Sequence, residues 1–396
     1  MNPDSSIAFD VFGREVRLSH PGKVMFPEQG WTKLDVARHY LACAEGALRG
    51  VYARPVILKR WPAGAGGQPF YQKRAPKTGS GQARDGADVP DRADEPGHGG
   101  GFAGLGSSEA ALGRGPGAAG EHEYAEVRFP SGRTADFLVP RHPADIIWMV
   151  QLDCLDLNPW PVRAGDLQHP DELRVDLDPS PGVGFATVRE VALVCGEVLT
   201  EHGLRGWPKT SGSRGIHILV RIEPRWTFGE VRGAALALAR EVERLAPDKA
   251  TSAWWKEERH GVFIDYNQNA GDRSVASAYS VRQTGLVSAP LSWDEVASAD
   301  PLAFRLDTFA TGRYARSGDL TRGIDEAAGR LDGLLELAQR QERAGLADAP
   351  WPPHFDKQEG EPPRVRPSRK RGTRVRDTGG SEATDVGGDA DEGPDE

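Results

Sequence analysis

Residues 172–178 read ELRVDLD, residues 209–222 read KTSGSRGIHILVRI, and residues 260–267 read HGVFIDYN. The apolar residues of the first and third segments predict strands, and the second segment predicts a glycine-containing turn that runs into a strand. Between these segments, the spacing of apolar residues over 186–203 and 227–245 predicts two helices. Strands that alternate with helices of this length predict a mixed α/β or α+β sheet domain.

The sequence on either side of this region also has the patterns of a folded domain. Thr32 and Asp35 have the spacing of a helix capping box, and the apolar residues that follow them have helical periodicity. Other predicted elements are short strands at 56–61 and 69–74 and helices at 144–155 and 323–344. No internal repeat is evident in the sequence.

Asp176 and Asp178 are separated by one residue, so in a strand their side chains point to the same face. Two such carboxylates repel each other unless a positive charge lies between them, and their hard oxygen ligands suit Mg²⁺ or Mn²⁺. Asp265 ends the apolar run VFID, where an unpaired carboxylate is costly. Three carboxylates are a minimal ligand set for two metal ions roughly 3.5–4 Å apart. The alternatives are a turn at the sequence DPSPG and a solvent-exposed strand end.

The segment 209–217, KTSGSRGIH, offers groups that bind phosphate. A turn bracketed by glycines can expose backbone N–H groups, Ser211 and Ser213 add hydroxyl donors, and Arg214 adds a charged fork. His217 begins the strand that follows, where a histidine is also commonly a satisfied core residue. The segment is not a Walker A loop, which requires GxxxxGK[ST]. In the sequence, this segment lies between the two predicted strands that carry the aspartates. The three elements in this order form a more specific pattern than any one of them alone.

The composition limits the class of protein. The chain has 396 residues, a formal net charge of -9, 38 % hydrophobic residues, 48 glycines and 30 prolines. These values predict two or three domains, or one large domain with appendages, in which disordered stretches dilute a folded core. Apolar runs stay below about 18 residues and the N-terminus has no secretory pattern, so we expect neither a membrane span nor export. Three widely spaced cysteines fit a reducing cytosol.

Two segments have the composition of disordered chain. Residues 77–122 contain 13 glycines in 46 positions and few large apolar residues, which predicts a flexible insertion. Residues 364–376 carry seven bases and no acid, and residues 377–396 carry eight acids and no base, which predicts a solvated tail. The predicted division is an N-terminal part of the main domain at 1–76, the insertion at 77–122, a catalytic core at 123–356 and a basic-then-acidic tail at 357–396.

Nine stretches spread over residues 10–355, with an interruption at 77–122, read GKVMFPEQGWTKLDVARHY, ILKRWP, FYQKRAP, LDLNPWPVR, LRVDLDPSPG, KTSGSRGIHI, VFIDYNQN, AYSVR and VSAPLSWDE. Together they resemble the polymerase domain of the bacterial ligase D proteins, which belong to the archaeo-eukaryotic primase superfamily. The resemblance implies an α+β fold, with a primase-like catalytic core of mixed sheets and flanking helices. The ligase and phosphoesterase domains of full-length ligase D have no match, so we expect a stand-alone form.

The resemblance assigns roles to residues at matching positions. Asp176, Asp178 and Asp265 match the family's catalytic, metal-binding carboxylates. Ser211 and His217 match residues that contact the triphosphate of the incoming nucleotide. The other positions implied in nucleotide binding are Lys59, Gln268, Arg282, Arg214 (often Lys in the family) and Asn158 (His in many members, close to the ribose).

The resemblance also implies residues that bind DNA. Phe70 and Tyr71 match an aromatic pair near the templating base, and the basic residue Lys73 follows them. Lys23 and Lys33 match two lysines that hold the 5′-phosphate on the downstream side of a gap or break. Because the net charge of the chain is not basic, DNA binding is expected to depend on a local strip of basic residues.

The implied function is that of a template-directed DNA/RNA nucleotidyltransferase, a primase-polymerase that fills gaps and extends ends in double-strand break repair by non-homologous end joining. The implied cofactors are two divalent ions, Mn²⁺ or Mg²⁺, and the substrates are NTPs or dNTPs, with ribonucleotides preferred. Expected partners are DNA with a 5′-phosphate at a gap or break, Ku and a separate DNA ligase, in the cytoplasm and at the nucleoid. Two alternatives stay open: a non-catalytic module that bridges DNA ends, and a primase in other gap-filling repair.

Overall fold

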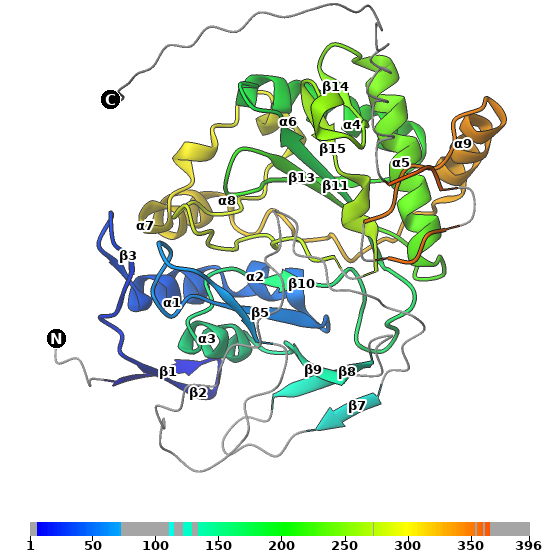
Figure 1. Cartoon of the computed structure of the whole chain (residues 1–396). Helices are drawn as coiled ribbons and strands as arrows, with labels where there is room; N and C mark the ends of the chain where they lie inside the picture. The colour runs from blue at the N-terminus through cyan, green and yellow to red at the C-terminus, as the bar shows by residue number, and fades with distance from the viewer. Residues whose placement is uncertain are drawn as a thin grey trace, which may run out of the picture. The chain divides into compact units, whose positions relative to one another are not determined.

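Five strands form the sheet that contains the three segments quoted first. Their order across the sheet is β12 (Gly206–Thr210), β13 (Ile216–Arg221), β11 (Glu172–Pro179), β15 (Val262–Ile264) and β14 (Ala250–Thr251). The central strand β11 pairs antiparallel with β13 and β15, whereas β14 and β15 run parallel (Figure 1). Nearly every residue of β11 is buried, which means that the strand is covered on both faces.

Helices α4 (Phe185–Glu201) and α5 (Phe228–Leu245) pack against this sheet and against each other (Figure 1). Val175 and Leu177 of β11 belong to the same hydrophobic core as the buried faces of both helices. Because side chains alternate along a strand, Asp176 points to the opposite face. The apolar face of β11 therefore packs in the hydrophobic core, and its opposite face can carry functional side chains such as Asp176.

A second sheet contains six strands. In order they are β10 (Asn158–Pro159), β5 (Val56–Arg60), β9 (Thr134–Val139), β8 (Glu123–Arg128) and β7 (Ala111–Arg114), with β6 (Phe70–Gln72) also paired to β5. Two hairpins precede it in the chain: β1 (Ser6–Val11) with β2 (Arg14–Ser19), and β3 (Val24–Phe26) with β4 (Trp31–Thr32). The helices of this part are α1 (Lys33–Ala42), α2 (Ala44–Val51) and α3 (Pro143–Gln151).

Hydrogen bonds join the two sheets near β10. Arg174 of β11 reaches across directly, because its Nη2 donates to the carbonyl oxygen of Pro159 at 2.9 Å. The amide of Ser277, in the chain that follows β15, donates to the carbonyl oxygen of Leu157 at 2.8 Å. These contacts hold the segment around Asn158 next to the central sheet.

The computed structural model describes residues 6–72, 111–114, 122–128, 134–271, 273–352, 355–358 and 361–364. Apart from residues 363 and 364, these belong to one unit, Met1–Pro362. Within this described part, none of the helices is both long and apolar enough to span a bilayer. The remaining elements are η1 (Lys256–Glu258), η2 (Tyr266–Asn269), α6 (Trp293–Val296), η3 (Pro301–Ala303), α7 (Leu306–Thr308), the π-helical η4 (Phe309–Tyr314), α8 (Ala315–Ser317) and α9 (Asp332–Arg343).

The architecture confirms the predicted α+β class of mixed sheets with flanking helices. The predicted capping box is present at the start of α1, where Thr32 and Asp35 exchange side-chain-to-backbone hydrogen bonds. The predicted helix at 323–344 is wrong in its first part, because α9 begins only at Asp332. Before that point the amide of Gly329 donates to the carbonyl oxygen at the end of β13, so the chain pairs with a strand end instead of forming a helix.

Two predicted segments lie largely outside the described residues. Within 77–122, the structure describes only strand β7 and His122. Of the predicted tail from residue 357 onward, it describes 357–358 and 361–364. The predicted insertion, the predicted tail and the domain division that they define stay predictions.

Candidate active site

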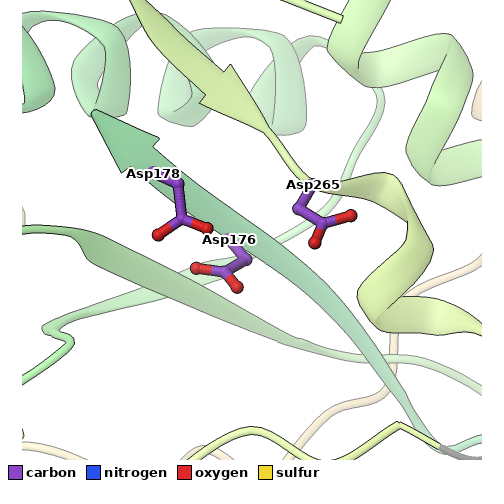
Figure 2. Close-up of side chains that lie close together, drawn as sticks. All are labelled: Asp176, Asp178 and Asp265. Carbon is purple, nitrogen blue, oxygen red and sulfur yellow. The ribbon is translucent and has the colours of Figure 1, made fainter. Parts of the chain in front are cut away.

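Three aspartates from two neighbouring strands lie together. Asp176 and Asp178 are on β11, Asp265 directly follows β15, and their carboxylate groups lie close to one another (Figure 2). One carboxylate oxygen from each lies within 4.8 Å of the others. The pairing of Leu177 with Ile264 places the two strand segments side by side, and the amide of Asp265 donates to the carbonyl oxygen of Asp176 at 2.8 Å. Asp176 is buried and Asp178 is exposed, so the cluster opens to solvent.

Repulsion and burial raise the pKa of all three carboxyl groups. The charge of Asp176 is the largest cause of the raised pKa of Asp178, whereas burial is the largest cause for Asp176. Burial, followed by the charge of Asp176, raises the pKa of Asp265 to about 6. Three mutually repelling carboxylates with oxygens within 4.8 Å of one another fit a hard divalent cation, so these residues can hold a metal.

His217 lies opposite Asp176, on the neighbouring strand β13. Its Nε2 is 3.1 Å from Oδ1 of Asp176, and its Nδ1 is 2.8 Å from Nζ of Lys209. Lys209 also donates to Oγ of Ser288 at 2.7 Å. Burial holds the pKa of Lys209 well below its usual value. When Lys209 is protonated it donates to Nδ1, and the ring proton is then on Nε2, facing Asp176. Burial, with the charge of Lys209 as the second cause, holds the pKa of His217 well below its usual value, so the ring is neutral.

The turn between β12 and β13 contains the predicted phosphate-binding residues. Ser211 Oγ accepts hydrogen bonds from two amides of the turn, including that of Gly215 at 3.0 Å. Gly215 has no room for a side chain, since a Cβ there would lie 2.4 Å from the carbonyl oxygen of Leu177 in β11. Arg214 is exposed on this turn, and its charge opposes the rise in the pKa of Asp178. The turn is therefore held tightly beside the carboxylates.

Gln268 and Arg282 reach the same carboxylates from two other segments. Gln268 lies in η2, and its Nε2 donates to Oδ2 of Asp265 at 3.3 Å. The charge of Arg282 lowers the pKa of both Asp176 and His217, which places Arg282 within electrostatic range of both. The predicted residues that lie on or near the central sheet are thus gathered in one place.

Four predicted residues lie on the second sheet. Lys59 and Arg60 of β5 pair with Tyr71 and Phe70 of β6, respectively. Both aromatic side chains are exposed, at 44 % for Phe70 and 42 % for Tyr71, and the guanidinium of Arg60 lies 5.0 Å from the centre of the Phe70 ring. Asn158 is buried in β10, which pairs with the other edge of β5. Within the described part of the chain, its Nδ2 has no hydrogen-bond partner.

Asp156 and Arg282 connect this second group to the first. Asp156 is buried, with Oδ2 3.6 Å from Nζ of Lys59. Burial raises the pKa of Tyr71, the charge of Asp156 raises it further, and that of Arg282 lowers it. Arg282 therefore acts electrostatically on Asp176 in one sheet and on Tyr71 in the other.

Lys23 and Lys33 form a third group around one carboxylate. Nζ of Lys23 is 2.6 Å from Oδ2 of Asp153, and Nζ of Lys33 is 2.9 Å from Oδ1. Lys33 also donates to the carbonyl oxygen of Gln151 at 2.7 Å, and burial lowers its pKa. The predicted DNA-binding residue Lys73 lies outside the described residues.

Three charged residues of these groups were not predicted from the sequence. Lys209 had a usable signal, because a hairpin through the turn 211–215 pairs it with His217. Asp156 had a weaker sequence signal: it is two residues before Asn158 in a mostly apolar run, so in a strand both side chains would point to the same face. Asp153 had none, because its lysine partners are far away in the sequence.

A family model described as "LigD, primase-polymerase domain" matches residues 32–96 and 115–321. The chain belongs to this family. The match includes the three aspartates and the turn between β12 and β13. The predicted resemblance is therefore confirmed, and with it the assignment to the DNA-directed nucleotidyltransferases of the LigD polymerase-domain family.

Relatives of known name agree with this membership. The "Multifunctional non-homologous end joining protein LigD" of Pseudomonas aeruginosa is 31 % identical over 335 residues, which are 84 % of this chain and 34 % of the relative. The protein of the same name from Mycolicibacterium smegmatis is 28 % identical over 324 residues, 81 % of this chain and 37 % of the relative. The chain thus spans little more than a third of the length of these LigD relatives.

A solved structure of the LigD polymerase-domain family is also similar to this chain. It is the "Polymerase Domain from Mycobacterium tuberculosis Ligase D in complex with DNA", with a TM-score of 0.61 and 26 % sequence identity. The match covers 80 % of this chain and 99 % of that chain. Nearly the whole of a LigD polymerase domain therefore has its counterpart here.

Proposed function

We propose that this chain is a template-directed nucleotidyltransferase that extends a 3′-hydroxyl with NTPs or dNTPs. Its role would be to fill gaps and extend ends during double-strand break repair by non-homologous end joining. The observation that carries the proposal is the cluster of Asp176, Asp178 and Asp265 beside the Ser211 turn and His217, in a chain of the LigD polymerase-domain family. Phosphoryl transfer requires charge neutralisation and positioning more than covalent chemistry, and this cluster offers both.

Asp176, Asp178 and Asp265 would hold two divalent ions, Mn²⁺ or Mg²⁺. When bound, such ions lower the pKa of the attacking hydroxyl and neutralise the leaving pyrophosphate. The residues of this chain prepare the site by keeping three carboxylates together in spite of their repulsion. Gln268 orients one of them through its hydrogen bond to Asp265.

Basic and polar residues around the carboxylates would bind the incoming nucleotide. Ser211, Arg214 and His217 are proposed to contact the triphosphate, because they surround the turn that abuts β11. The positive charges of Arg282 and Lys59 would add to the binding of the triphosphate. Asn158 would meet the ribose, since its buried Nδ2 has no hydrogen-bond partner among the described residues and can bond a 2′-hydroxyl. We therefore propose a preference for ribonucleotides.

DNA would be bound by residues at the surface of the second sheet and at the lysine pair. The exposed rings of Phe70 and Tyr71 offer faces on which an unpaired template base can stack, with Lys73 beside them in the sequence. Lys23 and Lys33 are proposed to bind the 5′-phosphate of the downstream strand. The similar LigD polymerase domain solved in complex with DNA supports DNA binding by this chain.

The wider context is proposed from the same relationship. Ku and a separate DNA ligase are proposed partners, and the cytoplasm and nucleoid the proposed location, because the named relatives are end-joining proteins. Residues 123–356, together with 1–76, would form the polymerase, with 77–122 as an insertion and 357–396 as a tail.

Primer extension on a gapped duplex with a 5′-phosphate tests the proposal. Purified protein with Mn²⁺ and NTPs should add nucleotides complementary to the template, and EDTA should abolish the addition. The Asp178→Ala variant should lose more than about 100-fold in rate, since loss of an outer-shell partner alone typically costs roughly 10–100-fold. Extension by Asp178→Ala at the wild-type rate, or no extension by the wild type, would contradict the proposal.

A further inference from the structure

Asp153 occupies the space between the two lysines that are proposed to bind a 5′-phosphate. Its two carboxylate oxygens are 2.6 Å from Nζ of Lys23 and 2.9 Å from Nζ of Lys33. The Lys33 side chain is only 4 % exposed and that of Asp153 13 %, whereas Lys23 is 27 % exposed. The lysine pair therefore already binds an anion, and this anion is part of the chain.

The local backbone admits an aspartate at this position but does not require one. Helix α3 ends at Gln151, and Asp153, two residues later, has a φ of 63°. Its backbone is held there, because its amide donates to the carbonyl oxygen of Val150 at 2.9 Å and its carbonyl oxygen accepts from the amide of Trp61 at 2.8 Å. Glycine or asparagine is preferred in the left-handed position after a helix, and a negative charge is disfavoured near a helix C-terminus. Among the described residues, the Asp153 carboxylate pairs with the two lysines.

We propose that Asp153 is an internal competitor for the anion site of Lys23 and Lys33, and that it sets how strongly this chain selects a 5′-phosphorylated DNA end. This inference rests on the proposed function, because that function places the downstream phosphate at the lysine pair. An incoming phosphate must displace the Asp153 carboxylate or share the two ammonium groups with it against charge repulsion. In both cases the carboxylate weakens phosphate binding and reduces the difference between a 5′-phosphate and a 5′-hydroxyl end.

A purely structural role for Asp153 predicts the opposite effect. If the carboxylate served only to hold the two ammonium groups in position, its removal would loosen them and weaken phosphate binding. Burial lowers the pKa of Lys33 and Asp153 opposes this shift, so under such a role the removal of Asp153 would also weaken the positive charge of Lys33. The sign of the change in phosphate selectivity therefore distinguishes a competitor from a scaffold.

The test compares the full-length protein with Asp153→Asn and Asp153→Gly. Asparagine keeps the size of the side chain and tolerates a left-handed φ, and glycine is the residue that such a position prefers. Fluorescence anisotropy at one fixed low salt concentration measures the Kd for gapped duplexes that differ only in a 5′-phosphate or 5′-hydroxyl downstream. The ratio of the hydroxyl Kd to the phosphate Kd should rise about fivefold, the effect of one unit-charge repulsion at contact distance in water. Asp248→Asn, an exposed aspartate after α5, is the matched charge control and should leave the ratio unchanged.

A ratio that stays constant or falls in the Asp153 variants overturns the inference. If one variant fails to fold by circular dichroism, the other decides, because they alter the backbone preference differently. Primer extension by the same wild-type preparation distinguishes a failure of the Asp153 inference from a failure of the proposed function. If the wild type extends the primer normally but the Kd ratio does not change in the Asp153 variants, only the role of Asp153 is refuted. If the wild type does not extend the primer, the proposed function is refuted. A ratio that is insensitive to Lys23→Ala refutes the lysine site and the inference with it.

Discussion

Asp176 and His217 face each other across the ladder between β11 and β13, with Oδ1 of the aspartate 3.1 Å from Nε2 of the histidine. Behind the ring, Nζ of Lys209 is 2.8 Å from Nδ1. The charge of Lys209 lowers the pKa of Asp176, in opposition to the burial that raises it. Burial lowers the pKa of Lys209 well below its usual value. In its protonated form, Lys209 favours the ionised carboxylate of Asp176 and fixes the tautomer of the histidine between them.

Replacing Lys209 by methionine should therefore shift metal binding to higher pH. The variant keeps most of the side-chain volume but removes the positive charge. The pKa of Asp176 is then no longer lowered by Lys209, so the carboxyl group loses its proton at a higher pH. The midpoint of Mn²⁺ binding against pH should rise, and the kcat/KM for NTP should fall about tenfold, the value of one charge-assisted hydrogen bond. Calorimetric titration of Mn²⁺ at several pH values measures the midpoint. The same midpoint in variant and wild type would show that Lys209 is uncharged in the folded protein.

The metal-free protein should lose stability as the pH rises from about 4 to about 6. The folded-state pKa of Asp265 is raised to about 6 from the ordinary aspartate value of about 3.9, so the folded chain keeps this proton to a higher pH than the unfolded chain does. The resulting stabilisation is complete below pH 4 and disappears as the pH rises through 6. Thermal denaturation in EDTA across this range measures the decline.

Two controls make this pH dependence specific to the carboxylate cluster. Asp265→Asn should decline less over the same pH range, because it removes the group that titrates. Mn²⁺ should restore the Tm above pH 6, since a ligand that binds only the folded state stabilises it. A decline of equal size in the variant would assign the pH dependence to other groups.

The carboxylate cluster could be predicted from sequence because its geometry follows from local rules. A spacing of two residues in a strand fixes the common face of Asp176 and Asp178, and an apolar run that ends in a carboxylate marks Asp265. Asp153 could not be predicted, because its partner Lys23 is 130 positions away and only the tertiary fold brings them together. For the same reason, the predicted helix at 323–344 was too long: its first part pairs with a strand end from another part of the chain.

Gly215→Ala should damage the phosphate-binding turn and the fold together. A Cβ at this position would lie 2.4 Å from the carbonyl oxygen of Leu177, a backbone atom of β11 that cannot move independently of the central sheet. We expect a loss of about 1–3 kcal/mol in the free energy of unfolding, typical of forcing extra volume into a packed site. Chemical denaturation measures it, with Gly165→Ala as a control, because a Cβ there meets no atom within 4 Å. Equal stability of the two variants would contradict this account.

Lys23→Ala and Lys33→Met should remove the preference for a 5′-phosphorylated gap. Each substitution deletes one ammonium group from the proposed phosphate site, and methionine keeps the buried stem of Lys33 packed. The ratio of extension rates on 5′-phosphate and 5′-hydroxyl substrates should fall about tenfold or more in the double variant. Lys249→Ala, an exposed lysine that pairs with Glu190, is the matched control. If the ratio in the double variant equals that of the control, the phosphate is bound elsewhere.

Asn158 offers a direct test of how the sugar is read. Its buried Nδ2 is a hydrogen-bond donor without a partner in the described part of the chain, so a ribose 2′-hydroxyl beside it would gain a bond that a deoxyribose lacks. Asn158→Ala should therefore lower the ratio of rNTP to dNTP incorporation about fivefold, the value of roughly 1 kcal/mol for one hydrogen bond. Asn158→His, which provides a longer donor, should raise the ratio. Single-nucleotide incorporation at matched rNTP and dNTP concentrations gives both values, and a ratio that is the same in all three proteins would mean that another residue reads the sugar.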